Sequence, residues 1–457
     1  MIFKWVVNEK MTIINAAQEN IAKVWGVQQP KEGERYRLMK YHLRVDHEDG
    51  VLLHNVVTGE LIRLSSEETA LLDALPAPYS PAMRELVEKR FLVPESYDEH
   101  KSVQQLRKIL TAYGKKNEIT GYTILPTTNC NARCFYCYEA NYKHLNMSEE
   151  TAHQTVEYIR THCGGNKVSI GWFGGEPTIA TARIDQICRE LQEAGIEYSA
   201  SMISNGYLLD GAMADKAKEL WKLTNIQITL DGTEDIYNQV KSYVSVSGSP
   251  YQKVLENIGG LLDRDIRVSV RMNLDRHNAE NLRELIDELA ERFAGRENFS
   301  CYVWPLFDDC GFDPVHHSAE DADWLMEKKL KLNGYIEEHL RCSKKQEQLS
   351  FLKLNSCMAD NDASVIIGPG GNLAKCEHCT EDVLGTVFDG ERDAVQLAHW
   401  KETVEYAECA DCPLYPSCKM LKHCFSTGRC YGGEQAEKIQ NAKEAMEAAC
   451  KAEQEIV

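Results

Sequence analysis

The chain has 457 residues, 43% hydrophobic and 26% charged, which is long enough for two or three folded domains. Its 51 Lys and Arg against 70 Asp and Glu give a formal charge of −19, so we expect neither nucleic acid nor an anionic membrane as a partner. It has no run of eighteen apolar residues, and its start lacks the charged-then-apolar order of a signal peptide, which predicts a cytoplasmic protein.

The first 110 residues predict a small module of their own, without cysteine. In chain order we expect strands over 51–54 and 61–64, a helix opened by the capping-box pair Ser65 and Glu68 and running to Leu75, a helix over 82–90, a strand over 91–93 and a helical connector over 98–110. Strands, helices and a returning strand within about a hundred residues are typical of a winged-helix-like domain.

Strands and helices alternate from Tyr122 onward, which predicts an α/β fold with a parallel sheet. Strands are expected over 122–125, 168–173, 199–203, 226–230, 268–272 and 301–304, and helices over 149–161, 184–194, 213–223, 251–262 and 279–293. Six strands are too few for a complete eight-stranded barrel. The alternation predicts an open sheet or partial barrel over 115–305, a bridging region over 306–356 and a cysteine-rich domain over 357–457 that ends in a helix from Glu434.

Seventeen cysteines, an odd number in a reduced compartment, indicate metal binding rather than disulfides. Cys130, Cys134 and Cys137 follow the first predicted strand with the spacing C-x3-C-x2-C. Three such thiolates can hold three irons of a [4Fe–4S] cluster and leave the fourth iron open. Zinc is the alternative, although it favours four ligands in paired C-x2-C units.

This spacing resembles that of the radical S-adenosylmethionine (SAM) enzymes. The resemblance implies that the open iron chelates SAM and that a 5′-deoxyadenosyl radical abstracts a hydrogen atom from the substrate. Polar and glycine residues at the ends of successive predicted strands match the family's cofactor contacts, as ligands of parallel α/β folds bind there. The implied contacts are Gly174, Gly175 and Glu176 near the methionine amino group, Ser204 and Asn205 at the ribose and methionine, Tyr136 near the adenine, Lys241 where relatives carry a carboxylate-binding Arg, and Arg271 on the fifth strand.

A second group of cysteines resembles the iron–sulfur SPASM extension, except that five residues rather than three separate Cys418 from Cys424. The resemblance implies that Cys357, Cys376 and Cys424 bind one auxiliary cluster, completed by Cys342, Cys379 or a substrate thiol. It implies that Cys409, Cys412, Cys418 and Cys430 bind a second, with Cys450 as the alternative to Cys430. A zinc ribbon from the pairs 376/379 and 409/412 is the competing interpretation, although its 29-residue gap exceeds the usual 15–20. Cys163, Cys188, Cys301 and Cys310 are expected to be buried hydrophobes.

Together these motifs resemble the maturases of ribosomally synthesised peptides (RiPPs). The resemblance implies SAM and three [4Fe–4S] clusters as cofactors, and an oxidoreductase that installs a thioether or carbon–carbon crosslink in a precursor peptide. The N-terminal module would bind the leader of that peptide as an added strand, or serve as a scaffold or dimerisation domain. An electron donor such as flavodoxin or ferredoxin is also implied. The alternatives are a sulfatase-maturing, formylglycine-forming enzyme and a non-catalytic iron–sulfur carrier.

The catalytic base is unassigned. His316-His317 beside Asp308-Asp309 could supply one or form a solvated loop.

Overall fold

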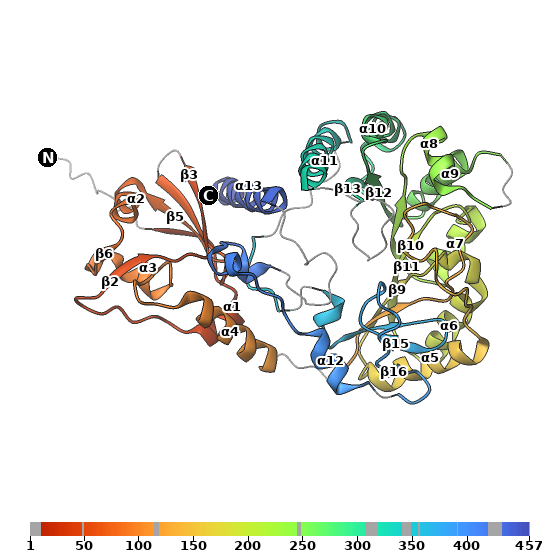
Figure 1. Ribbon diagram of the computed structural model, residues 1–457, viewed down its shortest axis with the longest axis horizontal. Coiled ribbons are helices and arrows are strands. Elements are labelled where there is room, and N and C mark those ends of the chain that lie inside the picture. Colours follow the sequence, from red (N-terminus) through yellow and green to blue (C-terminus); the bar gives the residue numbers. More distant parts are fainter. Residues whose placement is uncertain are drawn as a thin grey trace.

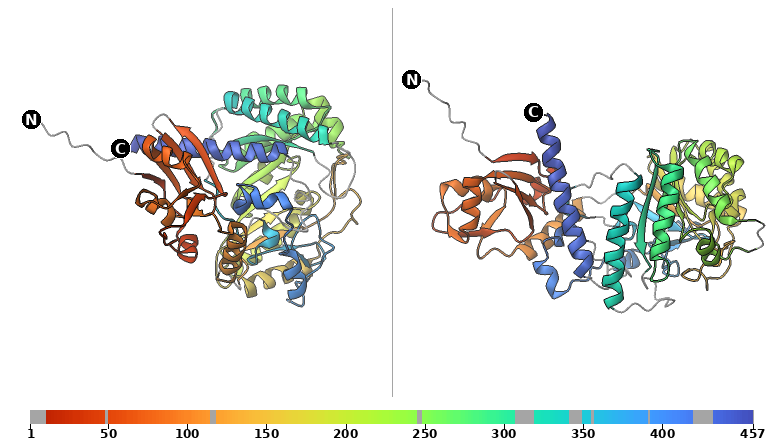
Figure 2. Two further views of the ribbon diagram at one scale, coloured as in Figure 1. Left: turned by 60° about the vertical axis from the view of Figure 1, so that its left-hand side comes forward. Right: turned by 90° about the horizontal axis from the view of Figure 1, so that it is seen from above.

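The computed structural model describes residues 11–47, 50–113, 118–244, 248–306, 319–340, 349–354, 357–390, 392–418 and 432–456. The N-terminal module lies at one end of the molecule, the large α/β domain at the other, and C-terminal segments lie between them (Figures 1 and 2). Cys310, Cys342, Cys424, Cys430, His316-His317 and Asp308-Asp309 fall outside the described residues. No helix in the described ranges is long and apolar enough to cross a membrane.

The N-terminal module contains two small antiparallel sheets, ordered β1-β5-β4-β3 and β6-β2-β7. Its elements are β1 (Thr12–Asn15), α1 (Glu19–Trp25), β2 (Arg35–Leu38), β3 (His42–His47), β4 (Gly50–Asn55), β5 (Leu61–Ser65), α2 (Ser66–Asp73), β6 (Ala77–Pro78), the 3₁₀ turn η1 (Pro81–Met83), α3 (Arg84–Glu88), β7 (Leu92–Pro94) and α4 (Glu99–Tyr113). The predicted capping box is present, because the Ser65 hydroxyl accepts from the Glu68 backbone while Glu68 accepts from Ser65. Helix α2 ends before Leu75, which precedes Pro76 and so disfavours a helical backbone.

The large domain follows the predicted alternation of strands and helices. Its elements are β8 (Gly121–Ile124), α5 (Glu149–His162), β9 (Val168–Trp172), η2 (Pro177–Ala180), α6 (Thr181–Glu193), β10 (Tyr198–Ser204), α7 (Gly211–Glu219), β11 (Leu223–Thr229), α8 (Glu234–Lys241), α9 (Pro250–Leu262), β12 (Arg267–Leu274), α10 (Ala279–Phe293) and β13 (Phe299–Pro305). The six strands from β8 to β13 pair in sequence order, all parallel. The prediction of an α/β fold with a partial six-stranded barrel is confirmed.

The C-terminal part contributes to both neighbouring regions. Its elements are α11 (Ala319–Leu340), η3 (Met358–Asp360), β14 (Ser364–Ile367), β15 (Asn372–Ala374), β16 (Gly385–Thr386), α12 (Ala394–Trp400), η4 (Ala407–Asp411), η5 (Tyr415–Ser417) and α13 (Gly432–Ile456). Strand β14 pairs in parallel with β8, and β15 and β16 extend the same sheet. Helix α13 packs against β3 and β1 of the N-terminal module and against α11.

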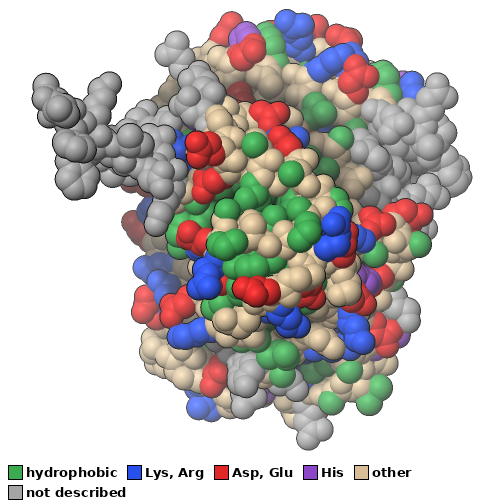
Figure 3. Space-filling view, turned by 90° about the vertical axis from the view of Figure 1, so that its left-hand side faces the viewer, with side chains coloured by type: hydrophobic (Ala, Val, Ile, Leu, Met, Phe, Trp, Pro, Cys, Tyr) green, Lys and Arg blue, Asp and Glu red, His purple; other side chains and the backbone are tan. Residues whose placement is uncertain are grey.

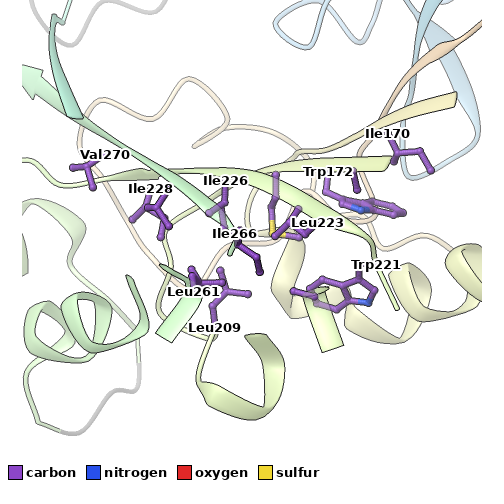
Figure 4. Packing of buried hydrophobic residues seen from close by; sticks show 14 of the residues in the cluster. Ile170, Trp172, Leu209, Trp221, Leu223, Ile226, Ile228, Leu261, Ile266 and Val270 are labelled. Carbon is purple, nitrogen blue, oxygen red and sulfur yellow. The ribbon is translucent and has the colours of Figure 1, made fainter. Parts of the chain in front are cut away.

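The barrel core forms because alternate strand residues face the surrounding helices. On β9, Val168, Ile170 and Trp172 are buried while Ser169 is exposed. Figure 4 shows Ile170 and Trp172 with side chains of β11 and with Trp221 and Leu261 in one hydrophobic layer. This layer fixes the strands, so that their carboxyl ends present polar residues at one edge. Cys163, Cys188 and Cys301 are buried in it, as predicted.

Candidate active site

The first thiol motif lies in a long loop that follows β8. The base of this loop is closed by a bridge between Thr127 and Asn146, where the Thr127 hydroxyl donates to Asn146 Oδ1 at 2.7 Å. Asn129 Nδ2 donates to the same oxygen at 2.9 Å. The loop that carries Cys130, Cys134 and Cys137 is therefore anchored at both ends at the carboxyl edge of the barrel.

Two glycines after β9 allow this loop to approach the barrel. A Cβ on Gly174 would lie 2.3 Å from the Thr127 carbonyl oxygen, and one on Gly175 would lie 2.4 Å from that of Asn129. The backbones are close enough for Glu176 N to donate to the Asn129 carbonyl at 2.8 Å. In the structure, the glycines thus let the cysteine loop seat on the sheet.

Glu176 connects the ends of β9 and β10. Its fully buried carboxylate accepts from the Ser204 hydroxyl at 2.9 Å and from the Asn205 backbone at 2.8 Å. Burial raises the pKa of Glu176, and hydrogen bonds led by that from Thr178 oppose the rise. Asn205 Nδ2 in turn donates to Asn131 Oδ1 in the cysteine loop at 2.7 Å. The predicted contact residues of these two strands thus form one network with the loop.

Asp231, Lys241 and Tyr136 form a second buried network. Lys241 Nζ lies 3.0 Å from Asp231 Oδ2, and the Tyr136 hydroxyl donates to the same oxygen at 2.8 Å. Both charged side chains are at most 4% exposed. Burial lowers the pKa of Lys241, but the Asp231 carboxylate raises it well above its ordinary value. The ammonium is therefore held charged beside the cysteine loop.

The fifth strand joins this network through Asn273. Asn273 Nδ2 donates to Asp231 Oδ1 at 2.9 Å, and Arg271 Nε donates to Asn273 Oδ1 at 2.9 Å. Asp231 and Asn273 are not among the predicted cofactor contacts, although each directly follows a predicted strand. The position of the Asp231 carboxylate at a strand end could have indicated a site residue. Its hydrogen-bond partners come from distant parts of the sequence and could not be predicted.

The three loop thiols suit the cluster that their spacing indicates. Burial raises the pKa of Cys130 to about 12, and the charges of Glu176, Cys134 and Cys137 add to the rise. Burial likewise raises the pKa of Cys137 to about 11. A raised pKa means that deprotonating these buried thiols costs free energy. Bound iron would offset that cost, because a coordinating thiol is deprotonated.

Cys376 and Cys379 form a thiol pair next to the cysteine loop. A hydrogen bond between these two thiols, together with burial, raises the pKa of Cys376. His378, between them, lies with its ring 4.2 Å from that of Tyr138, and its carbonyl accepts from the Tyr142 hydroxyl at 3.2 Å. Both tyrosines follow Cys137 closely in sequence. The Cys376–Cys379 turn is therefore seated on the loop of the first motif.

The other C-terminal cysteines lie in different surroundings. Cys409, Cys412 and Cys418 pack against a hydrophobic cluster of the N-terminal module, whereas Cys376 and Cys379 pack in the barrel core. The two cysteine pairs of the competing zinc ribbon, 376/379 and 409/412, therefore lie in separate hydrophobic clusters. Cys450 is 1% exposed in a cluster with Leu43 and Met446, which favours a packing role for it.

The chain is similar to several known proteins. Residues 124–289 match the radical SAM superfamily. The GTP 3′,8-cyclase of Clostridium perfringens (strain 13 / Type A) is 23% identical over 280 residues, 58% of this chain and 82% of that protein. Native anSMEcpe with bound AdoMet and Cp18Cys peptide has a TM-score of 0.56 at 14% identity, covering 73% of this chain and 99% of that one. Streptococcus suis SuiB bound to precursor peptide SuiA has a TM-score of 0.48 at 14% identity, covering 84% and 94%.

Residues 124–289 are thus a radical SAM domain, and the chain carries the fold of a radical SAM enzyme. This domain implies SAM and a [4Fe–4S] cluster as cofactors, and the Cys130–Cys137 loop has the donor set to hold that cluster.

Proposed function

We propose that this protein is a radical SAM peptide maturase. It would abstract a hydrogen atom from a core residue of a ribosomal precursor peptide and install an intramolecular thioether or carbon–carbon crosslink. The observation that carries the proposal is the placement of thiols: one set on the radical SAM barrel, a pair seated on that set through Tyr138 and His378, and a third set against a separate N-terminal module. A barrel that needed only one cluster would not require the other thiols.

The chain's own residues divide the cofactor site between them. We propose that Cys130, Cys134 and Cys137 hold the first cluster, while Gly174, Gly175, Glu176, Ser204, Asn205, Tyr136, Lys241 and Arg271 form the SAM pocket. When bound, the cluster and SAM would supply the radical that takes the hydrogen atom. Lys241 is paired with Asp231, and this pair holds the Lys241 ammonium in place beside the thiols. Its contribution to the pocket would be the positive charge of that ammonium.

We further propose that the region over 357–457 is a SPASM-type domain with two auxiliary [4Fe–4S] clusters. Cys357, Cys376 and Cys424 would bind the first, and the thiol contact of Cys376 with Cys379 favours Cys379 as its fourth ligand over Cys342 or a substrate thiol. Cys409, Cys412, Cys418 and Cys430 would bind the second. The bridging region over 306–356 would join this domain to the barrel.

The N-terminal module, over residues 1–110, would bind the leader of the precursor peptide. Among the described residues, β1 and β3 form the edges of one small sheet and β6 and β7 those of the other, and an edge strand can accept an added strand. Figure 3 shows hydrophobic side chains gathered on this side of the molecule among charges of both signs. The net charge of −19 makes nucleic acid or an anionic membrane a poor partner. A cytoplasmic location with a flavodoxin or ferredoxin as electron donor would suit the oxygen-sensitive clusters.

Anaerobic reconstitution tests the proposal. The chain should bind about twelve irons, form 5′-deoxyadenosine on reduction with SAM, and remove two hydrogens from a peptide encoded beside its gene. An unchanged peptide mass despite 5′-deoxyadenosine formation would refute the maturase assignment. Absence of 5′-deoxyadenosine from a fully loaded chain would instead indicate an electron carrier.

A formylglycine-forming enzyme is the second candidate, because the sequence resembles such enzymes from Cys130 onward. Oxidation of a serine also removes two hydrogens, so the mass change alone does not separate the two. Formylglycine is an aldehyde and reacts with a hydroxylamine probe, whereas a crosslink does not. A product that takes up the probe would favour this second function.

A further inference from the structure

The loop that carries Cys409, Cys412 and Cys418 is built on the N-terminal module. Its thiols are half-buried against a cluster whose members come mainly from residues 11–113: Ile21, Met39, Tyr41, Val57, Val93, Val103, Leu106, Leu110, Leu352 and Tyr415. The chain has therefore placed these three cysteines on a module some three hundred residues earlier in sequence, as the Arg107–Tyr415 separation of 308 residues shows.

Tyr415, which lies between Cys412 and Cys418, is the centre of this contact. Its ring is 1% exposed and stacks on Tyr41 with centroids 5.5 Å apart. The His100 ring lies 4.7 Å away, and the Arg107 guanidinium lies over the Tyr415 ring at 4.9 Å. The Tyr415 hydroxyl donates to Glu405 at 2.7 Å. Three side chains of the N-terminal module thus enclose one ring of the thiol loop.

The same module also holds the backbone between the thiols. Arg107 donates to the carbonyls of Tyr415 and Pro416, both at 2.8 Å. The Tyr41 hydroxyl donates to the Ala410 carbonyl at 3.2 Å, and Lys40 pairs with Asp411. Fixing these backbone groups limits the conformations that the loop can sample, which lowers the entropic cost of bringing its thiols to one metal centre.

Helix α13 supplies a further contact. Gln435 Nε2 donates to Cys412 Sγ at 3.1 Å. The helix itself is held on the N-terminal sheet by Met446 and Ala442, which pack with Leu43 and Leu52. A hydrogen bond to a ligating sulfur stabilises negative charge on it, and so raises the reduction potential of an iron–sulfur cluster.

We propose that the N-terminal module has a second task besides peptide docking: together with α13, it is the scaffold that positions Cys409, Cys412 and Cys418 as ligands of one cluster. Arg107 and Tyr415 are positioning residues, and Gln435 tunes the Cys412 sulfur. The inference rests on the thiol ligation proposed above. It implies that the N-terminal module is required even for reactions that need no leader peptide.

Arg107→Gln tests the scaffold, with Lys108→Ala on the exposed face of the same helix as the matched control. After reconstitution of the full chain, Arg107→Gln should hold about four fewer irons than the control and lose the electron paramagnetic resonance signal of one auxiliary cluster. In the metal-free chain, the same variant should alkylate several-fold faster at Cys409, Cys412 and Cys418, as mapped by peptide mass spectrometry. Equal iron content and equal alkylation in both variants would overturn the scaffold.

Gln435→Leu tests the sulfur contact without disturbing the loop's seat, with the exposed Gln440→Leu as its control. It should keep the full iron content and lower the reduction potential of one auxiliary cluster; an unchanged potential would overturn the role of Gln435. A wild-type chain short of four irons would refute the proposed ligation instead, and the alkylation rates would still decide whether the module positions the thiols.

Discussion

The close contact between Gly175 and the backbone of the cysteine loop gives the sharpest prediction, through the substitution Gly175→Ala. The added methyl group would lie 2.4 Å from the Asn129 carbonyl oxygen and 2.6 Å from that of Thr128, against 3.4 Å for an ordinary contact. The loop must therefore retreat by 3.4 − 2.4 = 1.0 Å, because both obstacles are backbone. Forcing such a shift costs about 1–3 kcal/mol of folding free energy, and a displacement of ~1 Å at reacting groups costs roughly a hundredfold in rate.

We expect Gly175→Ala to fold with a lowered midpoint of denaturant unfolding and to lose most of the iron bound by the first motif. The rate of 5′-deoxyadenosine formation should fall by about two orders of magnitude. Gly370→Ala is the control, because a Cβ at Gly370 meets no atom within 4 Å. If Gly175→Ala matched that control in iron content and rate, the close approach would not be what seats the loop.

Three further substitutions test other parts of the structure. Lys241→Met should lower the free energy of unfolding by about 3–5 kcal/mol, because it leaves the buried Asp231 carboxylate without its counter-charge. Adding Asp231→Asn should recover part of the lost stability. A loss below about 1 kcal/mol in urea titration would contradict a stabilising buried pair. Met446→Ala on α13 should cost about 2–5 kcal/mol and expose residues 432–456 to proteolysis, whereas the exposed Glu447→Ala should not. Burial lowers the pKa of His54 below its ordinary value of 6.5. As the pH falls, His54 is therefore protonated in the unfolded chain before it is protonated in the folded chain. Its contribution to stability is therefore complete above pH 6.5 and is lost as the pH falls through the folded pKa, with a slope of at most about 1.4 kcal/mol per pH unit. His54→Gln should remove this slope from melting curves of the metal-free chain, and an unaltered slope would contradict the assignment.

The barrel could be predicted from the sequence because its signals are local. The helix predicted over 279–293 has the observed bounds, since Leu282, Leu285, Ile286 and Leu289 repeat at helical spacing. The helix expected over 213–223 instead ends at Glu219, and Leu223 begins β11. Lys222 has φ = 54°, a left-handed backbone conformation that interrupts the predicted helix. Non-glycine residues rarely adopt this conformation, so the sequence does not predict it.

Elements whose stability comes from distant partners were missed. The sequence predicted none of β1, α1, β2 and β3, whose short runs are stabilised by pairing and by packing within the N-terminal module. Strand β14 has four residues and depends on β8 for its place. The active site follows the same rule: the cysteine spacing located the loop, but the Tyr136–Lys241 contact joins residues 105 positions apart. No local pattern could report it.

The pairing of β14 with β8 also bears on how the protein is made. Ser364 lies opposite Gly121 in that ladder, so the barrel's first strand has one open edge while the intervening 242 residues are synthesised. Open edges are templates for wrong pairing, and nascent chains emerge at only about 5–20 residues per second. A ribosome would therefore carry an unfinished barrel for roughly ten seconds or more. Expression of the radical SAM domain cut off before Ser364 would make that vulnerable state permanent, so low solubility of such a fragment would report a missing strand rather than a defective active site.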